Sequence, residues 1–273
     1  MSTNSRNDYI IPIICGRLAN NLFMIAHAYA KALDYNKRLV VCKNQVNYFN
    51  GVSNDDYPNN IFRKIDFIDE VPESKVVNPA QPSDTEPTAY SGYYQSERYF
   101  SKYSKLIKEL FGPTPEFVDR IETELPMVFS NKITVIHVRR GDYLRLPNYH
   151  PTISPEYVYE AVKQIPQTDY YFIASDDIQW CKENINLPNK VFIEKYNSYE
   201  SLWLLSLCHN FVISNSSFSW WAAYLSNNPD KKVIAPETWF GPEGPNQWEE
   251  IYCEGWIKLP TYFENGFIFP KIS

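Results

Sequence analysis

Short apolar runs rich in β-branched residues recur through the second half of this 273-residue chain. They occupy residues 133–138, 170–174, 190–193, 211–214 and 232–235. Continuous apolar runs of this length are typical of strands buried on both faces of a parallel sheet. Strands that alternate with helices build a Rossmann-like unit with right-handed crossovers. The second half of the chain therefore predicts an α/β unit with a mostly parallel sheet.

Helical patterns fill the gaps between these runs. Ser154 and Pro155 are typical of a helix start, as the N-cap and a first-turn residue. The apolar residues that follow have the i, i+3, i+4, i+7 spacing of a helix face: Val158, Ala161, Val162 and Ile165. Further helices are predicted over residues 176–184, 198–210 and 217–227.

The first half of the chain begins in the same way and then changes character. Its pattern predicts a strand over residues 10–15, a helix over 18–36 and a strand over 37–42. Four prolines in residues 71–90 predict a long irregular loop there. Two helices are expected after it, over residues 96–111 and 115–125. We expect an N-terminal Rossmann-like domain over 1–130, a C-terminal one over 131–258 and a tail over 259–273.

Composition excludes several classes of protein. The net charge of −6 argues against nucleic acid or an anionic membrane as the main partner. Five scattered cysteines without a Cys-x-x-Cys pair argue against a disulfide scaffold and favour a reducing compartment. The polar N-terminus and the lack of a long apolar run predict a soluble, cytoplasmic protein without a membrane span. Aromatic residues make up 16% of the chain, which fits either ordinary cores or sugar binding.

Polar clusters follow four of the predicted strands. They are residues 16–21, 139–143, 175–177 and 215–221. Ligands bind beyond the carboxyl ends of the strands in parallel α/β sheets, so these clusters are expected to converge on one crevice.

The chemistry of these clusters suits a nucleoside diphosphate. Ser216 and Ser217 lie at a predicted helix N-terminus, where free N–H groups and the helix dipole favour an anion. Arg139 or Arg140 adds a bidentate donor for a diphosphate. Asp176 is an acceptor suited to the N–H edge of guanine. Neither of the two common glycine-rich nucleotide motifs is present.

Each of these features also has a purely structural interpretation. The serines and Asp176 could simply cap helices, and Arg139 could pair with Asp142. His137 could be a hydrogen-bonded core histidine. Because four such features coincide at four strand ends, we favour the binding site over the structural interpretation.

No metal cofactor is expected. The chain contains no Asp-x-Asp pattern, and its four histidines lack zinc-ligand spacing. The charge of a departing diphosphate would then be stabilised by arginine and by helix N–H groups.

Four segments together carry a resemblance to known enzymes. Residues 137–143 (HVRRGDY) resemble the H-x-R-R-x-D motif of α-1,2-, α-1,6- and protein O-fucosyltransferases. Residues 214–223 (SNSSFSWWAA) closely resemble the signature of glycosyltransferase family 11, the α-1,2-fucosyltransferases. Residues 92–100 (GYYQSERYF) and 236–242 (PETWFGP) resemble two further motifs of that family. The likeness runs from about residue 14 to residue 242.

The resemblance implies a GT-B fold of two facing Rossmann-like domains with mostly parallel sheets. It implies inverting, metal-independent transfer of L-fucose from GDP-β-L-fucose, with GDP-fucose as donor substrate rather than cofactor. The acceptor implied is the 2-hydroxyl of a galactose-like residue of a glycan, giving an α-1,2 linkage. The transition state would be oxocarbenium-like, as in glycosidases.

The resemblance also implies roles for individual residues. Arg139 would hold the β-phosphate, and Asn20 would lie near the bond that breaks. The other implied donor-binding residues are His137, Arg140, Asp176, Ser216, Ser217, Phe218, Gly16 and Arg17. The acceptor-side candidates are Tyr94, Gln95, Glu97 and His150. The family usually opens with G-G-L-G-N-Q, and residues 16–21 (GRLANN) depart from it, most clearly at Asn21.

Two aspects of the function stay open at this point. The general base could be Asp142, Glu97 or His150, or the donor phosphate could assist transfer without a side-chain base. The alternative functions are a GT-B transferase that uses another sugar nucleotide and a non-catalytic carbohydrate- or nucleotide-binding protein.

Overall fold

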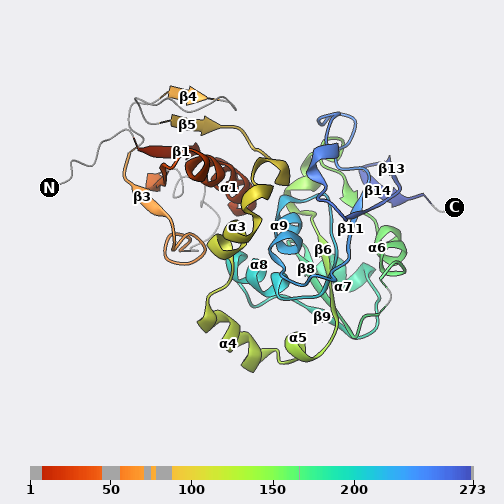
Figure 1. Ribbon diagram of the computed structural model, residues 1–273. Helices are drawn as coiled ribbons and strands as arrows, with labels where there is room; N and C mark the ends of the chain where they lie inside the picture. The colour runs from red at the N-terminus through yellow and green to blue at the C-terminus, as the bar shows by residue number, and fades with distance from the viewer. Residues whose placement is uncertain (1–7, 45–55, 71–74, 78–87, 166, 272–273) are drawn as a thin grey trace. The chain divides into compact units, whose positions relative to one another are not determined.

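The chain divides into two units in the computed structural model, Met1–Gly112 and Pro113–Ser273. The structure describes residues 8–44, 56–70, 75–77, 88–165 and 167–271, and Figure 1 colours these along the chain. The division lies earlier than the boundary expected after residue 130, because two short helices, α4 (Pro115–Glu124) and α5 (Met127–Ser130), belong with the second unit.

The first unit contains a five-stranded parallel sheet in the order β3-β2-β1-β5-β4. Its strands are β1 (Tyr9–Ile13), β2 (Arg38–Cys42), β3 (Asp66–Ile68), β4 (Lys75–Val77) and β5 (Thr88–Ser91). The predictions for β1 and β2 are confirmed. The predicted irregular loop over 71–90 is wrong in part, because β4 and the start of β5 lie within it. The rest of that loop, residues 71–74 and 78–87, lies outside the described residues.

Helix α1 (Leu18–Asp34) packs on β1, β2 and β5. Most of its residues are buried, and alternate alanines at Ala26, Ala28, Ala30 and Ala32 are within 2% of complete burial. Alternate positions of a helix point to opposite sides, so α1 is buried on more than one face. Ile11 on β1, Val40 on β2 and Ala89 on β5 form a buried apolar cluster in this unit.

The helix predicted over 96–111 is broken in the structure. Two 3₁₀ turns, η1 (Glu97–Tyr99) and η2 (Ser101–Tyr103), precede α3 (Ser104–Phe111). Phe100 separates the two turns with φ −147° and ψ 6°, and its ring is buried against Phe23. Burial of this ring therefore overrides the local helical pattern.

The second unit contains a six-stranded parallel sheet in the order β12-β11-β10-β6-β8-β9. Its strands are β6 (Ile133–Val138), β8 (Tyr170–Ser175), β9 (Lys190–Phe192), β10 (Asn210–Val212), β11 (Val233–Pro236) and β12 (Ile257–Leu259). Read from β9 to β12 and renumbered in chain order, this is the 3-2-1-4-5-6 order of the Rossmann fold. Five of the six strands were predicted, and the strand order reverses direction between β6 and β10.

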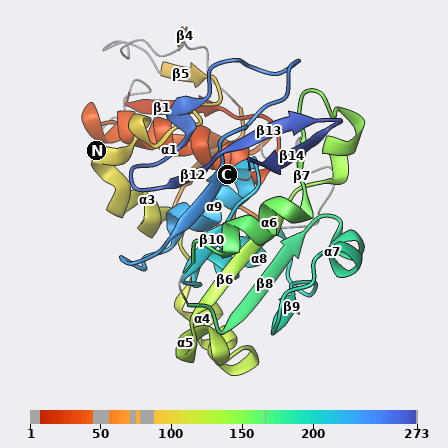
Figure 2. The same cartoon turned by 90° about the vertical axis from the view of Figure 1, so that its right-hand side faces the viewer.

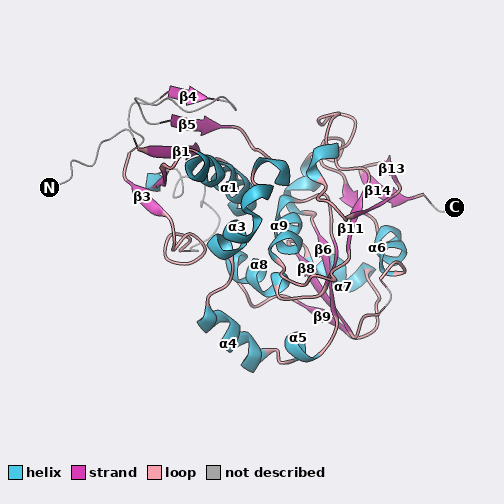
Figure 3. Ribbon diagram, viewed as in Figure 1, coloured by secondary structure: helices cyan, strands magenta, loops and turns pink. Residues whose placement is uncertain are grey.

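Helices cover both faces of this sheet. Helices α6 (Pro155–Val162) and α7 (Ile178–Asn184) lie on one side, and α8 (Ser198–Ser206) and α9 (Ser217–Leu225) on the other (Figures 1 and 3). The hydroxyl of Ser154 accepts from the N–H of Tyr157, which confirms the predicted start of α6. All six residues of β6 are buried because both faces are covered.

The residues expected to form a C-terminal tail are instead part of a third sheet. Strands β13 (Thr261–Glu264) and β14 (Phe267–Pro270) form an antiparallel hairpin, and β14 pairs with β7 (Thr152–Ile153), as Figure 2 shows beside α6. Asn265 and Gly266 connect the hairpin strands with φ values of 49° and 83°. An Asn-Gly pair with two positive φ values is the favoured two-residue hairpin turn.

His27 on α1 makes the stability of the first unit sensitive to acid. The ring is fully buried, and its centroid stacks 3.8 Å from that of Tyr94. Burial, with a smaller effect from Lys31, lowers the pKa of His27 to about 3. The unfolded chain therefore takes up a proton near pH 6.5 that the folded chain excludes, so stability is lost as the pH falls.

We predict that His27→Phe, which keeps a stacking ring, weakens this pH dependence. Between pH 7 and pH 5 the wild type is expected to lose about 2 kcal/mol of unfolding free energy through His27 alone. Urea denaturation at pH 7 and pH 5 measures the loss of unfolding free energy. This loss should be about 2 kcal/mol smaller in His27→Phe than in the wild type. An equal loss in both proteins would contradict the assignment.

Candidate functional site

The predicted ligand-binding residues of the second unit gather at the carboxyl ends of β6, β8 and β10. Val138 on β6 pairs in register with Ser175 on β8, so Arg139 and Asp176 follow side by side. The sheet reverses its strand order between β6 and β10, and open α/β sheets bind ligands at such a switch point. The strand register thus brings together residues that are far apart in the sequence.

The carboxylate of Asp176 holds the loop that follows β6. Its Oδ1 accepts from the backbone N–H of Arg140 at 2.9 Å, and its Oδ2 lies 3.0 Å from Nη1 of Arg139. Gly141 packs so closely on this carboxylate that a Cβ at residue 141 would collide with it. Only glycine therefore fits at position 141 while Asp176 keeps these contacts.

The two adjacent arginines have different surroundings. The Arg139 guanidinium pairs with both Asp142 and Asp176, and its side chain is 16% exposed. The Arg140 side chain points elsewhere: its Nε donates to Asp177 at 3.0 Å and its guanidinium lies 4.1 Å from the Trp180 ring centroid. Arg140 therefore fastens the end of β6 to α7, and Arg139 is the arginine available at the switch point.

His137 is a neutral group in the wall of the site. Its Nδ1 forms a 2.9 Å hydrogen bond with the Ser214 hydroxyl, and its ring stacks on Phe218. Burial, and next the positive charge of Arg139, lower the pKa of His137 to about 3. The imidazole is consequently uncharged near neutral pH, with its orientation fixed by Ser214.

The N-terminus of α9 lies at the same edge of the sheet. Ser216 is its N-cap, and the Ser216 hydroxyl accepts from the N–H of Phe218 at 3.3 Å. Ser217 is the first residue of the helix. The positive end of a nine-residue helix thus follows directly after β10.

Tyr143 and Asn215 connect these loops, and the sequence analysis did not single out either residue. The hydroxyl of Tyr143, whose pKa is raised by burial, donates to the Asn215 carbonyl at 3.0 Å. The Asn215 amide donates to the carbonyls of Pro151 and Trp239 at 3.0 and 2.8 Å. Asn215 is buried, and a buried amide needs hydrogen-bond partners. An asparagine directly after a buried strand and within the 214–223 motif is the sequence signal that could have identified it.

The first unit has a switch point of its own, between β1 and β5. The Gln95 amide, shortly after β5, donates to the Asn20 side chain on α1 at 2.9 Å. Gly16 has φ +76° and packs against Asn20, and Arg17 is the N-cap residue of α1. The structure therefore brings four of the predicted residues of this unit together.

Two other candidates of the first unit lie differently. The Tyr94 hydroxyl donates to the Ser91 carbonyl at 2.8 Å, and its ring packs on His27 inside the unit. Glu97 begins η1. The structure accordingly gives Tyr94 a packing role.

Of the three candidate bases, Asp142 and His150 lie in the second unit. Asp142 is 47% exposed and pairs with Arg139. The His150 ring stacks on Tyr143 with centroids 4.5 Å apart, and burial lowers the pKa of His150. Both groups are thus close to the loop that carries Arg139.

The described part of the chain lacks two other kinds of feature, a metal-binding cluster and a membrane-spanning helix. Across the described ranges, no group of three His, Cys, Asp or Glu side chains is arranged to hold a metal ion. None of the helices in those ranges combines the length and the apolar character that a membrane span requires.

We predict that Asn215→Ala lowers the free energy of unfolding by about 2–3 kcal/mol, because it leaves two buried carbonyls without their donors. Urea denaturation of the variant measures this loss. Asn186→Ala, at an exposed asparagine of the same unit, is the matched control and should stay within about 0.5 kcal/mol of the wild type. Equal effects of the two substitutions would show that Asn215 does not fasten the loops.

The fold is similar to that of solved fucosyltransferase structures. The structure is similar to NodZ α-1,6-fucosyltransferase co-crystallised with GDP, with a TM-score of 0.54 and 14% identity over 80% of this chain and 92% of that chain. NodZ from Bradyrhizobium gives a TM-score of 0.57 over 88% and 97% of the two chains. This likeness confirms the predicted α/β fold of the GT-B class.

The chain is also similar in sequence to curated glycosyltransferases. The chain is 27% identical to an α-1,2-colitosyltransferase of Escherichia coli over 290 residues, which cover 92% of this chain and 98% of the relative. It is 31% identical to the O-antigen biosynthesis glycosyltransferase WbnK of Escherichia coli over 46% of this chain and 44% of the relative. A galactoside α-(1,2)-fucosyltransferase 2 of Rattus norvegicus is 28% identical over 40% and 37% of the two chains.

The family model of glycosyl transferase family 11 matches residues 71–260, which is more than half of the chain. The matched range includes the segments around Arg139, Asp176 and Ser216 that the structure brings together. The relatives and the motifs agree with this match. The chain therefore belongs to glycosyl transferase family 11.

Proposed function

We propose that this protein transfers L-fucose from GDP-β-L-fucose to a glycan hydroxyl, the 2-hydroxyl of a galactose-like residue, and forms an α-1,2 linkage with inversion. The observation that carries the proposal is the position of Arg139. Its guanidinium lies at the switch point of a Rossmann-type sheet, at the same edge as the N-terminus of α9. An arginine and a helix N-terminus together suit a diphosphate.

The two carboxylates paired with Arg139 differ in how firmly they are held. Asp176 is 25% exposed and also accepts from the Arg140 backbone, whereas Asp142 is 47% exposed. An exposed ion pair contributes little free energy, so an incoming diphosphate can replace Asp142 at Arg139. Asp176 would stay in place as a positioning residue, which fits its contacts better than a direct contact with guanine.

We assign recognition of the guanine to His137. The ring is uncharged and held by Ser214, so it offers its second nitrogen to a base in a fixed orientation. Ser216, Ser217 and the Phe218 N–H group would line the phosphate position at the start of α9. We assign the acceptor to the first unit, where Asn20 and Gln95 meet.

When the donor diphosphate replaces Asp142 at Arg139, the Asp142 carboxylate becomes available to accept the proton of the acceptor hydroxyl. The acceptor oxygen forms a bond to the anomeric carbon while the bond from that carbon to the β-phosphate oxygen breaks. The proton of the acceptor hydroxyl passes to the freed Asp142 carboxylate, and GDP leaves with its negative charge. Arg139 and the α9 N–H groups stabilise that charge, so the proposed reaction needs no metal ion.

The identity of the transferred sugar has a second candidate. The relative that matches over 92% of this chain is named a colitosyltransferase. Colitose lacks one hydroxyl that fucose carries. A site that hydrogen-bonds this hydroxyl discriminates strongly against the deoxy sugar, whereas a site without such a bond accepts both.

We predict product formation from GDP-fucose, with equal rates in EDTA and in magnesium. The assay incubates the protein with a galactose-terminated oligosaccharide and either GDP-fucose or GDP-colitose, and mass spectrometry identifies the product. If GDP-colitose gives a product and GDP-fucose gives none, the transferred sugar is colitose and not fucose. Dependence on the metal, or failure with both donors while UDP-sugars react, would contradict the proposed donor and mechanism.

A further inference from the structure

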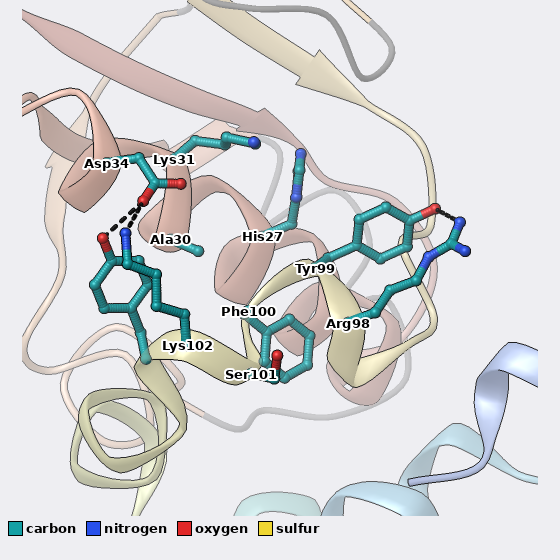
Figure 4. A pocket seen from close by; sticks show the side chains of 10 residues that line it. His27, Ala30, Lys31, Asp34, Arg98, Tyr99, Phe100, Ser101 and Lys102 are labelled. Carbon is teal, nitrogen blue, oxygen red and sulfur yellow. Dashed lines mark hydrogen bonds and ion pairs between the residues drawn. The ribbon is translucent and has the colours of Figure 1, made fainter. Parts of the chain in front are cut away.

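The first unit contains a pocket on the face of α1, away from the Asn20–Gln95 contact. Its volume is about 380 Å³, which lies within the range of small-molecule sites. The wall is formed by α1 and by the segment of η1 and η2, and Figure 4 shows the side chains that line it. The residues that matter for its chemistry are His27, Lys31, Asp34, Arg98, Tyr99 and Lys102.

The lining is electropositive. It contains three cationic side chains and one carboxylate, that of Asp34. This carboxylate is already satisfied, because its Oδ1 accepts from Lys102 at 2.8 Å and from the Tyr103 hydroxyl at 2.7 Å. Among the residues that the structure describes, the Lys31 ammonium has no hydrogen-bond or ion-pair partner. Lys31 acts on Asp34 only through its charge, without a direct contact, so the lining keeps a net positive charge with the Lys31 ammonium available to a ligand.

A polar group without a partner lies beside Lys31. His27 is buried, and neither of its ring nitrogens has a hydrogen-bond partner among the described residues. Figure 4 shows its side chain between those of Lys31 and Tyr99. An unpaired buried donor or acceptor carries a free-energy penalty that a ligand hydroxyl could relieve.

Aromatic rings complete the lining. Tyr99 lies edge-on to the His27 ring with centroids 5.4 Å apart, and Phe100 and Tyr103 also line the pocket. Rings combined with hydroxyl groups suit sugars, whose C–H faces pack on the rings while their hydroxyls form hydrogen bonds. The combination of these rings with Lys31 favours a sugar that carries a negative charge.

We infer that this pocket binds an acidic sugar residue, whose carboxylate pairs with Lys31 and whose ring packs beside Tyr99. His27 is seven residues after Asn20, about two turns further along α1. The pocket can thus hold a residue of the same glycan beyond the one that receives the sugar. This last step rests on the proposed function, whereas binding of the acidic sugar to the pocket does not.

The test measures binding without any donor. A disaccharide of galacturonic acid and the neutral disaccharide of galactose are titrated calorimetrically into the whole protein. We expect the acidic disaccharide to bind at least tenfold more tightly and to lose that advantage between 0.05 and 0.5 M salt. Equal affinity for the two disaccharides, or affinity for the acidic one that salt does not change, would overturn the inference.

Two variants locate the site. Lys31→Met should weaken binding of the acidic disaccharide about tenfold and leave that of the neutral one unchanged. Lys105→Met, at a 90% exposed lysine of the same unit, removes the same charge and should have no effect. Equal affinity of the two variants and the wild type for the acidic disaccharide would overturn the assignment. Inorganic sulfate that binds as tightly as the acidic disaccharide would overturn it too. If the wild type binds GDP but does not bind the acidic disaccharide, this inference is wrong and the proposed donor site is unaffected.

Discussion

The candidate donor site depends on the contacts that the Asp176 carboxylate makes. This carboxylate joins the ends of two neighbouring strands, since it lies just after β8 and accepts from the backbone that follows β6. The same carboxylate holds Nη1 of Arg139, and the absence of a side chain at Gly141 makes room for it. A partly exposed ion pair adds little to stability, so the main effect of this pair is to position the charge of Arg139. Arg139 is therefore held at the switch point before any ligand arrives.

The sheets of the two units share a reversal of strand order, but the residues at the two reversals differ in chemistry. Each sheet reverses its strand order beside its first strand, and each places polar residues at that point. The second unit supplies charges, an arginine with two carboxylates, next to a helix N-terminus. The first unit supplies the uncharged amides of Asn20 and Gln95, with Arg17 as the one charged residue of that group. We therefore assign the anionic donor to the second unit and the hydroxyl-rich acceptor to the first.

Sequence patterns predicted most of the second unit because its strands are continuous apolar runs, which a parallel sheet buries on both faces. They missed β7, β12, β13 and β14, which are only two to four residues long. Phe100 breaks the predicted helix because its ring packs on Phe23, a contact that local periodicity cannot reveal. The residue pattern alone left Arg139 and Arg140 as alternatives, and the family resemblance implied Arg139 for the β-phosphate. The structure adds the physical difference between them, because the Arg140 side chain turns toward Asp177 and Trp180.

The central claim is that Arg139 binds the diphosphate of a guanine nucleotide. Calorimetric titration of GDP in EDTA into the wild type, Arg139→Lys and Arg145→Lys tests it directly. Lysine keeps the charge of Arg139 but loses the bidentate geometry, so we expect at least a tenfold loss of affinity. Arg145 is exposed on the same loop, and its variant should bind as the wild type does. Unchanged GDP affinity in a folded Arg139→Lys protein would contradict the claim.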